Sequence, residues 1–190
     1  MLPTTNPHIC VACASQGPTC CHLLPGSEEH TFPLSPLEWQ RILDHVPDKG
    51  FFAHERNSPA FLASLRHLFP GEHERVEALF PSHGEHLRLA TRDDGDCAFR
   101  GPDGCILPNE VRPTYCRIFP FWVFGDRITL FKPAYCLAVR QARVVRALFD
   151  TMGMTEAEVR HLYGRLRLAW GLPPEKDMAS PVAAMSRRKK

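Results

Sequence analysis

Apolar residues between positions 35 and 81 recur at the three- and four-residue spacing of amphipathic helices. The motif Ser35-Pro36-Leu37-Glu38 has the form of a capping box with proline at the first helical position, and Pro47 stops the run. A second stripe extends from Ser58-Pro59 to Pro70, and a third ends at Pro81. The pattern predicts three helices with core-facing residues Trp39, Ile42, Leu43 and Val46, then Phe61, Leu62, Leu65, Leu68 and Phe69, then Val76, Leu79 and Phe80.

The pattern becomes strand-like between residues 87 and 131. Leu87 and Leu89 alternate with polar residues, and residues 97–100 are joined to 105–107 by Gly101-Pro102-Asp103-Gly104, a strong turn signal. Residues 121–124 and 127–131 flank Gly125-Asp126, which is typical of a hairpin with glycine at the first turn position. The sequence therefore predicts short strands and turns in this region.

Helical periodicity returns after Cys136. One helix is expected from Cys136 to Phe149, and another begins at a capping box over residues 155–158 and ends at Gly171 and Pro173. Residues 176–190 are expected to form a disordered basic tail. The last helix has an apolar face made of Val159, Leu162, Tyr163, Leu166 and Trp170.

These elements predict an α+β, helix-rich fold, in which a small irregular cysteine-rich metal-binding core with a β-hairpin is flanked by helices. A chain of 190 residues suits one domain and can bury a core without metal or disulfides. The predicted division is a metal-binding domain over residues 1–150 with a helical insertion at about 35–81, a C-terminal helix packed on it over 151–175, and the tail over 176–190.

The charge balance gives no general attraction to polyanions. The formal net charge is +2 at pH 7 and the isoelectric point is about 8.2, so neither nucleic acid nor a membrane is an expected partner. The sequence shows no signal peptide and no apolar run of membrane-spanning length. We therefore expect a cytoplasmic protein, whose thiols stay reduced.

Eight cysteines carry the candidate chemistry, in two segments that flank the cysteine-free helical region. Four disulfides are one interpretation of the even count, but the expected compartment, the chain length and the C-x-x-C spacing favour metal ligation. Four thiolates complete a tetrahedral zinc site or anchor an iron–sulfur cubane. The candidate ligands are Cys10, Cys13, Cys20, Cys21, Cys97, Cys105, Cys116 and Cys136.

The spacing of the first four cysteines bears on the number of centres. The gap between Cys10 and Cys13 lets both sulfurs turn onto one ion, whereas the side chains of neighbouring Cys20 and Cys21 diverge. Both can reach one metal only on irregular backbone; otherwise they serve two centres, or one of them is not a ligand. Eight thiolates divide into four plus four, so one centre and two centres both remain open.

Two arginines bracket Cys116 in the stretch Arg112–Phe121. Arg112 and Arg117 can offset the negative charge of a thiolate-ligated centre through N–H···S hydrogen bonds, and they are the predicted cofactor-binding residues. The alternative is that both are surface arginines paired with carboxylates.

Other polar side chains are weaker candidates. His8 and His22 lie beside cysteines and can replace a thiolate as ligand, whereas His83 and His86 are expected at the surface. The sequence contains no Ser/His/Asp order, H-E-x-x-H motif or P-loop, so whether the protein is an enzyme stays open. Candidate acid–base groups are Asp93, Asp94, Asp96 and Tyr115, although residues 93–96 also suit a solvated turn.

The ordered cysteine pattern resembles the zinc- or iron-chelating cysteine-cluster family called YkgJ-like. The shared features are a C-x-x-C, a Cys-Cys pair and a distal C…C…RP…CR.FPF block, here ending at Phe119-Pro120-Phe121, with Cys136 as the late cysteine. The gap between Cys13 and Cys20 is longer than is usual in the family. The resemblance covers about residues 10 to 136 and implies a bound zinc or iron centre. Some relatives carry this domain in flagellin lysine N-methylases thought to use an iron–sulfur centre, but no added methyltransferase region is visible here.

The sequence thus predicts a cysteine-cluster protein holding one or two thiolate-ligated centres, with an iron–sulfur centre of the [4Fe–4S] type favoured over zinc. Its expected role is redox chemistry, metal handling or cluster-dependent protein modification, with a metal ion or cluster and a protein partner or protein substrate as partners. The alternative is a structural-zinc interaction module without catalysis.

Overall fold

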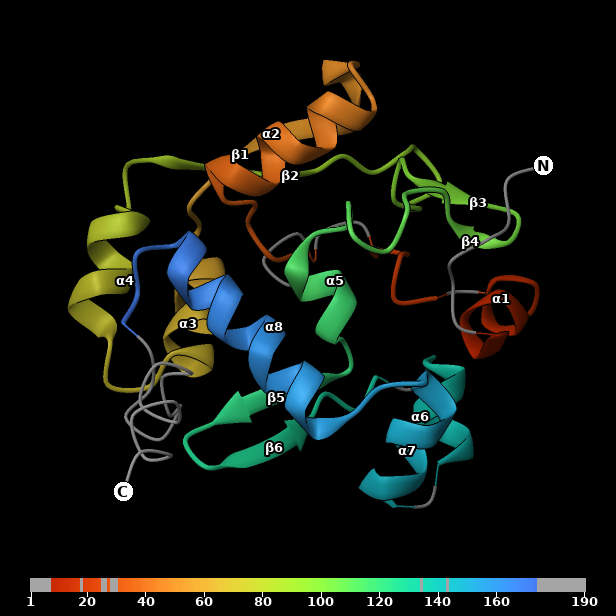
Figure 1. Cartoon of the computed structure of the whole chain (residues 1–190). Coiled ribbons are helices and arrows are strands. Elements are labelled where there is room, and N and C mark those ends of the chain that lie inside the picture. Colours follow the sequence, from red (N-terminus) through yellow and green to blue (C-terminus); the bar gives the residue numbers. More distant parts are fainter. Residues whose placement is uncertain are drawn as a thin grey trace, which may run out of the picture.

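The computed structural model describes residues 8–17, 19–24, 27, 31–133, 135–142 and 144–173. Within these ranges, helices surround three separate two-stranded antiparallel sheets, and α5 lies among them near the centre of the molecule (Figure 1). This mixture of helices and small sheets confirms the α+β prediction. The helices are α1 (His8–Ala14), α2 (Pro36–His45), the short 3₁₀ helix η2 (Lys49–Phe51), α3 (Pro59–Leu68), α4 (His73–Leu79), α5 (Thr114–Ile118), α6 (Leu137–Gln141), α7 (Val145–Met152) and α8 (Glu156–Ala169).

The three helices predicted between residues 35 and 81 are α2, α3 and α4. The capping box at α2 is present: the Ser35 hydroxyl accepts a hydrogen bond from the Glu38 amide at 3.3 Å, and the Glu38 carboxylate accepts one from the Ser35 amide at 3.1 Å. The Ser58 hydroxyl caps α3 by accepting from the Phe61 amide at 3.1 Å.

The sheets are short hairpin-like pairs. Strand β1 (Phe52–Arg56) was not expected; it pairs with β2 (Glu85–Leu89), the predicted strand that contains Leu87. The predicted pairing around residues 101–104 is reduced to β3 (Arg100–Gly101) and β4 (Gly104–Cys105). The hairpin expected after residue 120 is confirmed as β5 (Phe121–Phe124) and β6 (Arg127–Leu130).

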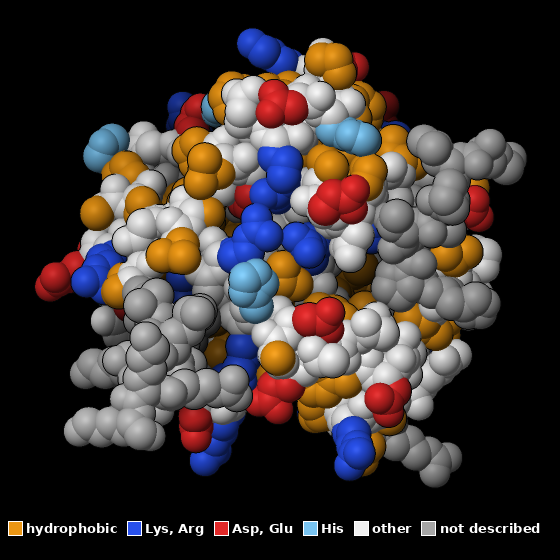
Figure 2. Space-filling view, in the orientation of Figure 1, with side chains coloured by type: hydrophobic (Ala, Val, Ile, Leu, Met, Phe, Trp, Pro, Cys, Tyr) orange, Lys and Arg blue, Asp and Glu red, His pale blue; other side chains and the backbone are white. Residues whose placement is uncertain are grey.

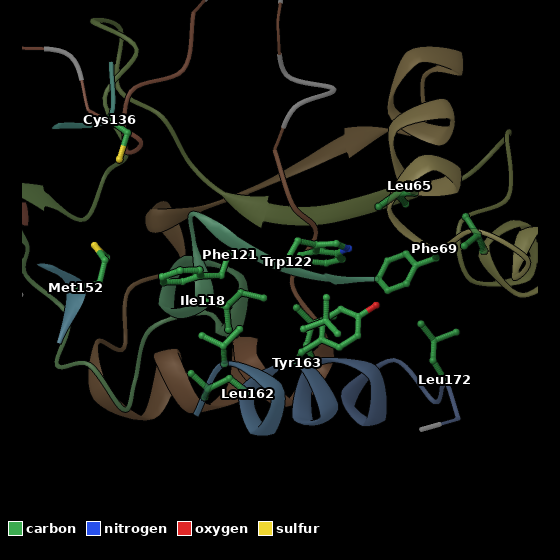
Figure 3. Packing of buried hydrophobic residues seen from close by; sticks show 14 of the residues in the cluster. Leu65, Phe69, Ile118, Phe121, Trp122, Cys136, Met152, Leu162, Tyr163 and Leu172 are labelled. Carbon is green, nitrogen blue, oxygen red and sulfur yellow. The ribbon is translucent and has the colours of Figure 1, made fainter. Parts of the chain in front are cut away.

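The main core lies between β5 and the helices α3, α4 and α8. Figure 3 shows Leu162 and Tyr163 of α8 pointing toward Phe121 and Trp122 of β5. The Trp122 and Tyr163 rings meet edge to face at 5.0 Å, and the Trp122 indole donates to the Leu68 carbonyl at 3.1 Å. The predicted capping box of α8 is present at Thr155 and Glu158.

A smaller apolar cluster supports the cysteine-bearing turns. It contains Ile42 of α2 and Phe99, and the Phe51 ring stacks on Phe99 at 4.5 Å. Cys97 and Cys105 pack at its edge. This cluster fixes the β3–β4 hairpin to α2 without drawing its two thiols fully into the core.

Two expectations about the helices were wrong, and a third concerns residues that the structure does not describe. The helix expected from Cys136 to Phe149 is divided into α6 and α7, and α1 and α5 are helices in segments where irregular backbone, strands or turns were expected. The predicted disordered tail over residues 176–190 lies outside the described residues. In the described chain, no helix combines the length and the apolar character needed to cross a bilayer.

Candidate metal centre

Helix α1 places the first two cysteines against the end of the cysteine-bearing region. Cys10 and Cys13 lie one helical turn apart on α1, which packs against both α6 and β4. Cys136 is the N-terminal cap residue of α6, and Cys105 belongs to β4. The Cys13 thiol lies 4.0 Å from the Tyr135 carbonyl, beside Cys136. Residues more than 90 positions apart in the chain therefore meet at α1.

The Cys20-Cys21 pair is held by the turn that precedes β3. The Cys97 amide donates to the Cys21 carbonyl at 2.6 Å, and His22 forms an isolated antiparallel bridge with Asp96. The His22 Nδ1 atom also lies 2.9 Å from the Asp96 carboxylate. These contacts place Cys21 beside Cys97, although 75 positions of chain separate them.

Asp96 and Arg100 also hold the Cys20-Cys21 segment and the end of α1 against the turn that contains Asp96. Asp96 is only 6% exposed and forms an ion pair with Arg100, whose guanidinium also donates to the carbonyls of Ala14 at 3.1 Å and Gly17 at 3.3 Å. The Asp96 carboxylate thus accepts from both His22 and Arg100, and these hydrogen bonds lower its pKa against the opposing effect of burial. Asp96 is a structural clamp, which corrects its interpretation as part of a solvated turn.

All eight cysteines line one cavity of about 870 Å³. None of them is in a disulfide. Cys20 and Cys116 keep accessible surface, yet the protein around each thiol desolvates it and contributes to a pKa well above the usual value. Both residues line the cavity. The gathered thiols come from α1, the Cys20-Cys21 turn, the β3–β4 hairpin, α5 and the start of α6.

The thiols do not converge on a point. Among the described residues, no three Cys, His, Asp or Glu side chains lie close enough together to hold a single metal ion. The eight sulfurs are distributed around the walls of the cavity instead.

Burial dominates the electrostatics of the thiols. It raises the pKa of Cys10 and of Cys97 to about 12, and neighbouring cysteines add to the shift. Cys21 differs: a hydrogen bond from Cys20 lowers its pKa, although burial opposes this, and Thr19, Arg112 and Arg100 act in the same lowering direction. A positive metal centre would reverse the burial effect, because thiolates and not thiols are its ligands.

Charge interactions join the thiols into one connected group. Cys10 interacts with Cys136, Cys21 and Cys13, while Cys97 interacts with Cys21 and Cys105, and Cys116 interacts with Cys21, Cys97 and Cys105. Cys20 interacts with Cys21, Cys10 and Cys116, so the Cys20-Cys21 pair connects the thiols of α1 with those of the hairpin and α5.

The two arginines of the predicted site have different surroundings. Arg112 is 7% exposed, donates to the Leu107 carbonyl at 2.9 Å, and lowers the pKa of Cys105 by its charge and by a hydrogen bond, in opposition to the larger effect of burial. Arg117 lines the cavity too, but burial, Arg165 and Arg41 lower its pKa, so its strongest charged neighbours are arginines.

The histidines and Tyr115 complete the list of sequence candidates. His22 lines the cavity, whereas the side chain of His8 lies outside the described part. His86, expected at the surface, is 4% exposed: it stacks on the Phe61 ring at 3.8 Å and contacts the Asn57 side chain at 2.9 Å. Tyr115 also lines the cavity, and burial raises the pKa of its phenol well above the usual value.

Comparison with models of known protein families, with curated proteins and with solved structures finds no match. The assignment of chemistry therefore depends on the residues themselves. Sequence reasoning missed Arg100 and Tyr135; Tyr135 precedes Cys136, and its nearness to a candidate ligand was the available signal.

Proposed function

We propose that this protein holds two thiolate-ligated centres, iron–sulfur in kind, in the cavity lined by its cysteines. The observation that carries the proposal is that all eight thiols, drawn from two distant segments of the chain, line one cavity of about 870 Å³. Chance burial of eight cysteines would distribute them through the core, since free cysteine behaves as a small apolar residue. Here only Cys136 is buried, and the others keep partial or full exposure.

The distribution of the sulfurs favours a cluster over a single ion. Zinc binds thiolates at about 2.3 Å, so four ligands of one zinc ion must converge on a point. A [4Fe–4S] cluster binds each of its four thiolates through a different iron atom, so its ligands lie farther apart. The described thiols surround a volume and do not converge. This arrangement supports the iron–sulfur interpretation suggested by the all-cysteine donor set.

Backbone contacts suggest how the eight ligands divide. The Cys21 carbonyl accepts a hydrogen bond from the Cys97 amide, and Cys105 lies on the β3–β4 hairpin that follows Cys97. We therefore assign Cys21, Cys97 and Cys105, together with Cys116, to one centre. We assign the remaining four to the other, because α1 packs on α6: Cys10, Cys13, Cys20 and Cys136. When bound, such centres would supply one-electron redox chemistry. The Arg112 guanidinium beside Cys105 would favour the more negative reduced state.

Metal and sulfide analysis tests the type of centre. Protein prepared without oxygen from iron-fed cells should be brown, contain iron and acid-labile sulfide in equal amounts, and bleach with dithionite. A colourless protein with stoichiometric zinc and no sulfide would overturn the proposal and favour a structural-zinc module.

Paired serine variants test the division into two centres. Cys97→Ser should lose about half of the bound iron and sulfide, Cys10→Ser should lose the other half, and the double variant should lose nearly all. If either single variant removes all of the iron while remaining folded by circular dichroism, the eight thiols serve one shared centre. Ser58→Ala, which alters the cap of α3 and no residue that lines the cavity, is a control for a general loss of stability.

A further inference from the structure

Basic side chains line the same cavity where it opens to solvent. Arg117 lies on α5, and His161 and Arg165 lie four residues apart on one face of α8, which packs against α5. All three line the cavity; His161 and Arg165 are exposed, and Arg117 is half-buried. Figure 2 shows Lys and Arg side chains gathered with a His in the middle of the face that carries α5 and α8.

The positive charge of this group is not neutralised by ion pairs. Within the described ranges, neither Arg117 nor Arg165 forms an ion pair with a carboxylate, and the Arg117 Nε atom is buried without a hydrogen-bond partner. Arg41 adds a third guanidinium nearby, and it donates to backbone carbonyls: to Val111 at 3.3 Å and to Arg112 at 2.9 Å. A buried N–H group without a protein partner is costly, so the Arg117 guanidinium is free to donate to an acceptor that is not part of the described protein.

The acidic residues near this group are engaged elsewhere or lie in solvent. Glu158 also lines the cavity, but its carboxylate accepts hydrogen bonds from the Thr155 amide at 2.7 Å and from the Thr155 hydroxyl at 2.8 Å. Asp150 and Glu110 are exposed, and the charge of Glu110 acts on Arg117 less strongly than the charges of Arg165 and Arg41. The strongest charges acting on Arg117 at the cavity opening are therefore positive.

We propose that Arg117, His161 and Arg165 bind the carboxylate or phosphate group of a small molecule at the opening of the cavity, next to Cys116. The planar guanidinium fork matches the paired oxygens of both groups, and such hydrogen bonds are stronger than neutral ones. The three basic side chains line a cavity, which suits binding of a small molecule better than binding of a protein surface. This site goes beyond the proposed metal centres and does not depend on which metal the cysteines hold.

Binding of inorganic phosphate and of citrate tests the site. Isothermal titration calorimetry uses the protein as purified without oxygen, with chloride holding the ionic strength constant. Arg165→Gln should weaken binding of the preferred anion about tenfold, as expected for one lost charge-assisted hydrogen bond. The anion that binds more tightly identifies phosphate or carboxylate as the ligand class. Arg127→Gln is the matched control, because its side chain is 85% exposed on the β5–β6 hairpin.

The opposite results are equally clear. If wild-type protein binds neither anion, or if Arg165→Gln and Arg127→Gln bind as wild type does, the site is overturned. The anion affinity of Arg117→Gln is compared with that of wild type only after the iron content of both has been measured, because Arg117 follows the proposed ligand Cys116. Loss of anion binding in Arg117→Gln with unchanged iron supports the site independently of the metal proposal. Wild-type protein that lacks iron but binds the anion counts against the metal proposal alone.

Discussion

The aromatic core and the cysteine-lined cavity follow opposite packing rules, and helix α5 belongs to both. In the core, Trp122 and Phe121 are almost completely buried and their rings contact other rings. The cavity instead has partly exposed thiols around a volume of about 870 Å³. On α5, Ile118 points into the core while Cys116 and Arg117 line the cavity. Helix α5 therefore connects the cysteine-lined cavity directly to the aromatic core.

The largest expected effect comes from opening the core. Trp122→Ala removes a fully buried indole that contacts five aromatic rings, and it should reduce the free energy of unfolding by about 4 kcal/mol. The loss should be the same in metal-loaded and metal-free protein, because Trp122 does not line the cavity. Urea unfolding of both forms checks this. A loss confined to metal-loaded protein would mean that the two regions are not separate.

The next effect concerns a charge buried at the edge of the core. Arg167 is 2% exposed; it forms an ion pair with Glu72 at 2.5 Å and donates to the Pro173 carbonyl at 2.7 Å. Glu72→Ala should cost about 3 kcal/mol of unfolding free energy, since it leaves a buried charge without its partner. Restoring an apolar match with Glu72→Ala/Arg167→Met should recover part of that loss. A double variant less stable than the single one would contradict this explanation.

His86 makes the core region sensitive to acid. Burial lowers its pKa from 6.5 to about 4, so between these values the unfolded chain binds a proton that the folded protein does not. Its contribution to stability is complete above pH 6.5 and should fall by about 3 kcal/mol as the pH drops to 4. Chemical unfolding of wild type and His86→Gln across this range measures it. Parallel curves for the two proteins would show that His86 is not the titrating group.

The difference between the regions also explains what the sequence could predict. Helices α2, α3 and α8 can be predicted from apolar periodicity and from their N-terminal caps. In each cap the two residues that bond each other are three positions apart, so the local sequence pattern is sufficient. The gathering of the thiols depends on contacts such as Cys97 with Cys21 and Arg100 with Ala14, which join distant segments and leave no local pattern. The sequence predicts cysteine as the ligand type, but it does not predict that all eight cysteines line one cavity.

Other misses have the same physical origin. Helix α5 has only five residues between Pro113 and Phe119, too short to show a period, and it is held from outside by Glu38. His86 is the one buried residue of β2, and its burial is decided by the Phe61 ring of α3. Tertiary packing, absent from any window of sequence, set both outcomes.

The smallest expected effect lies where the two regions meet, at Glu38. Its side chain is 4% exposed: one carboxylate oxygen accepts from the Thr114 amide at 2.7 Å, at the start of α5, and the other from the Ser35 amide and hydroxyl at 3.1 and 2.8 Å. Glu38→Gln keeps the shape but turns an NH₂ group toward one of these donors, so it should cost about 1 kcal/mol. Because the lost contact can be the one that anchors α5, transfer of metal from Cys116 to a chelator should also become faster.

A matched variant separates this local effect from a general one. Glu77→Gln removes a carboxylate that is 56% exposed and pairs with Arg66 on the surface, so it should change neither the free energy of unfolding nor the rate of metal release measurably. Chelator kinetics and urea unfolding on the two variants and wild type make the comparison. Equal release rates in Glu38→Gln and Glu77→Gln would show that α5 is held by the core alone, through Ile118 and Tyr115, and that the capping box of α2 has no influence on the cavity.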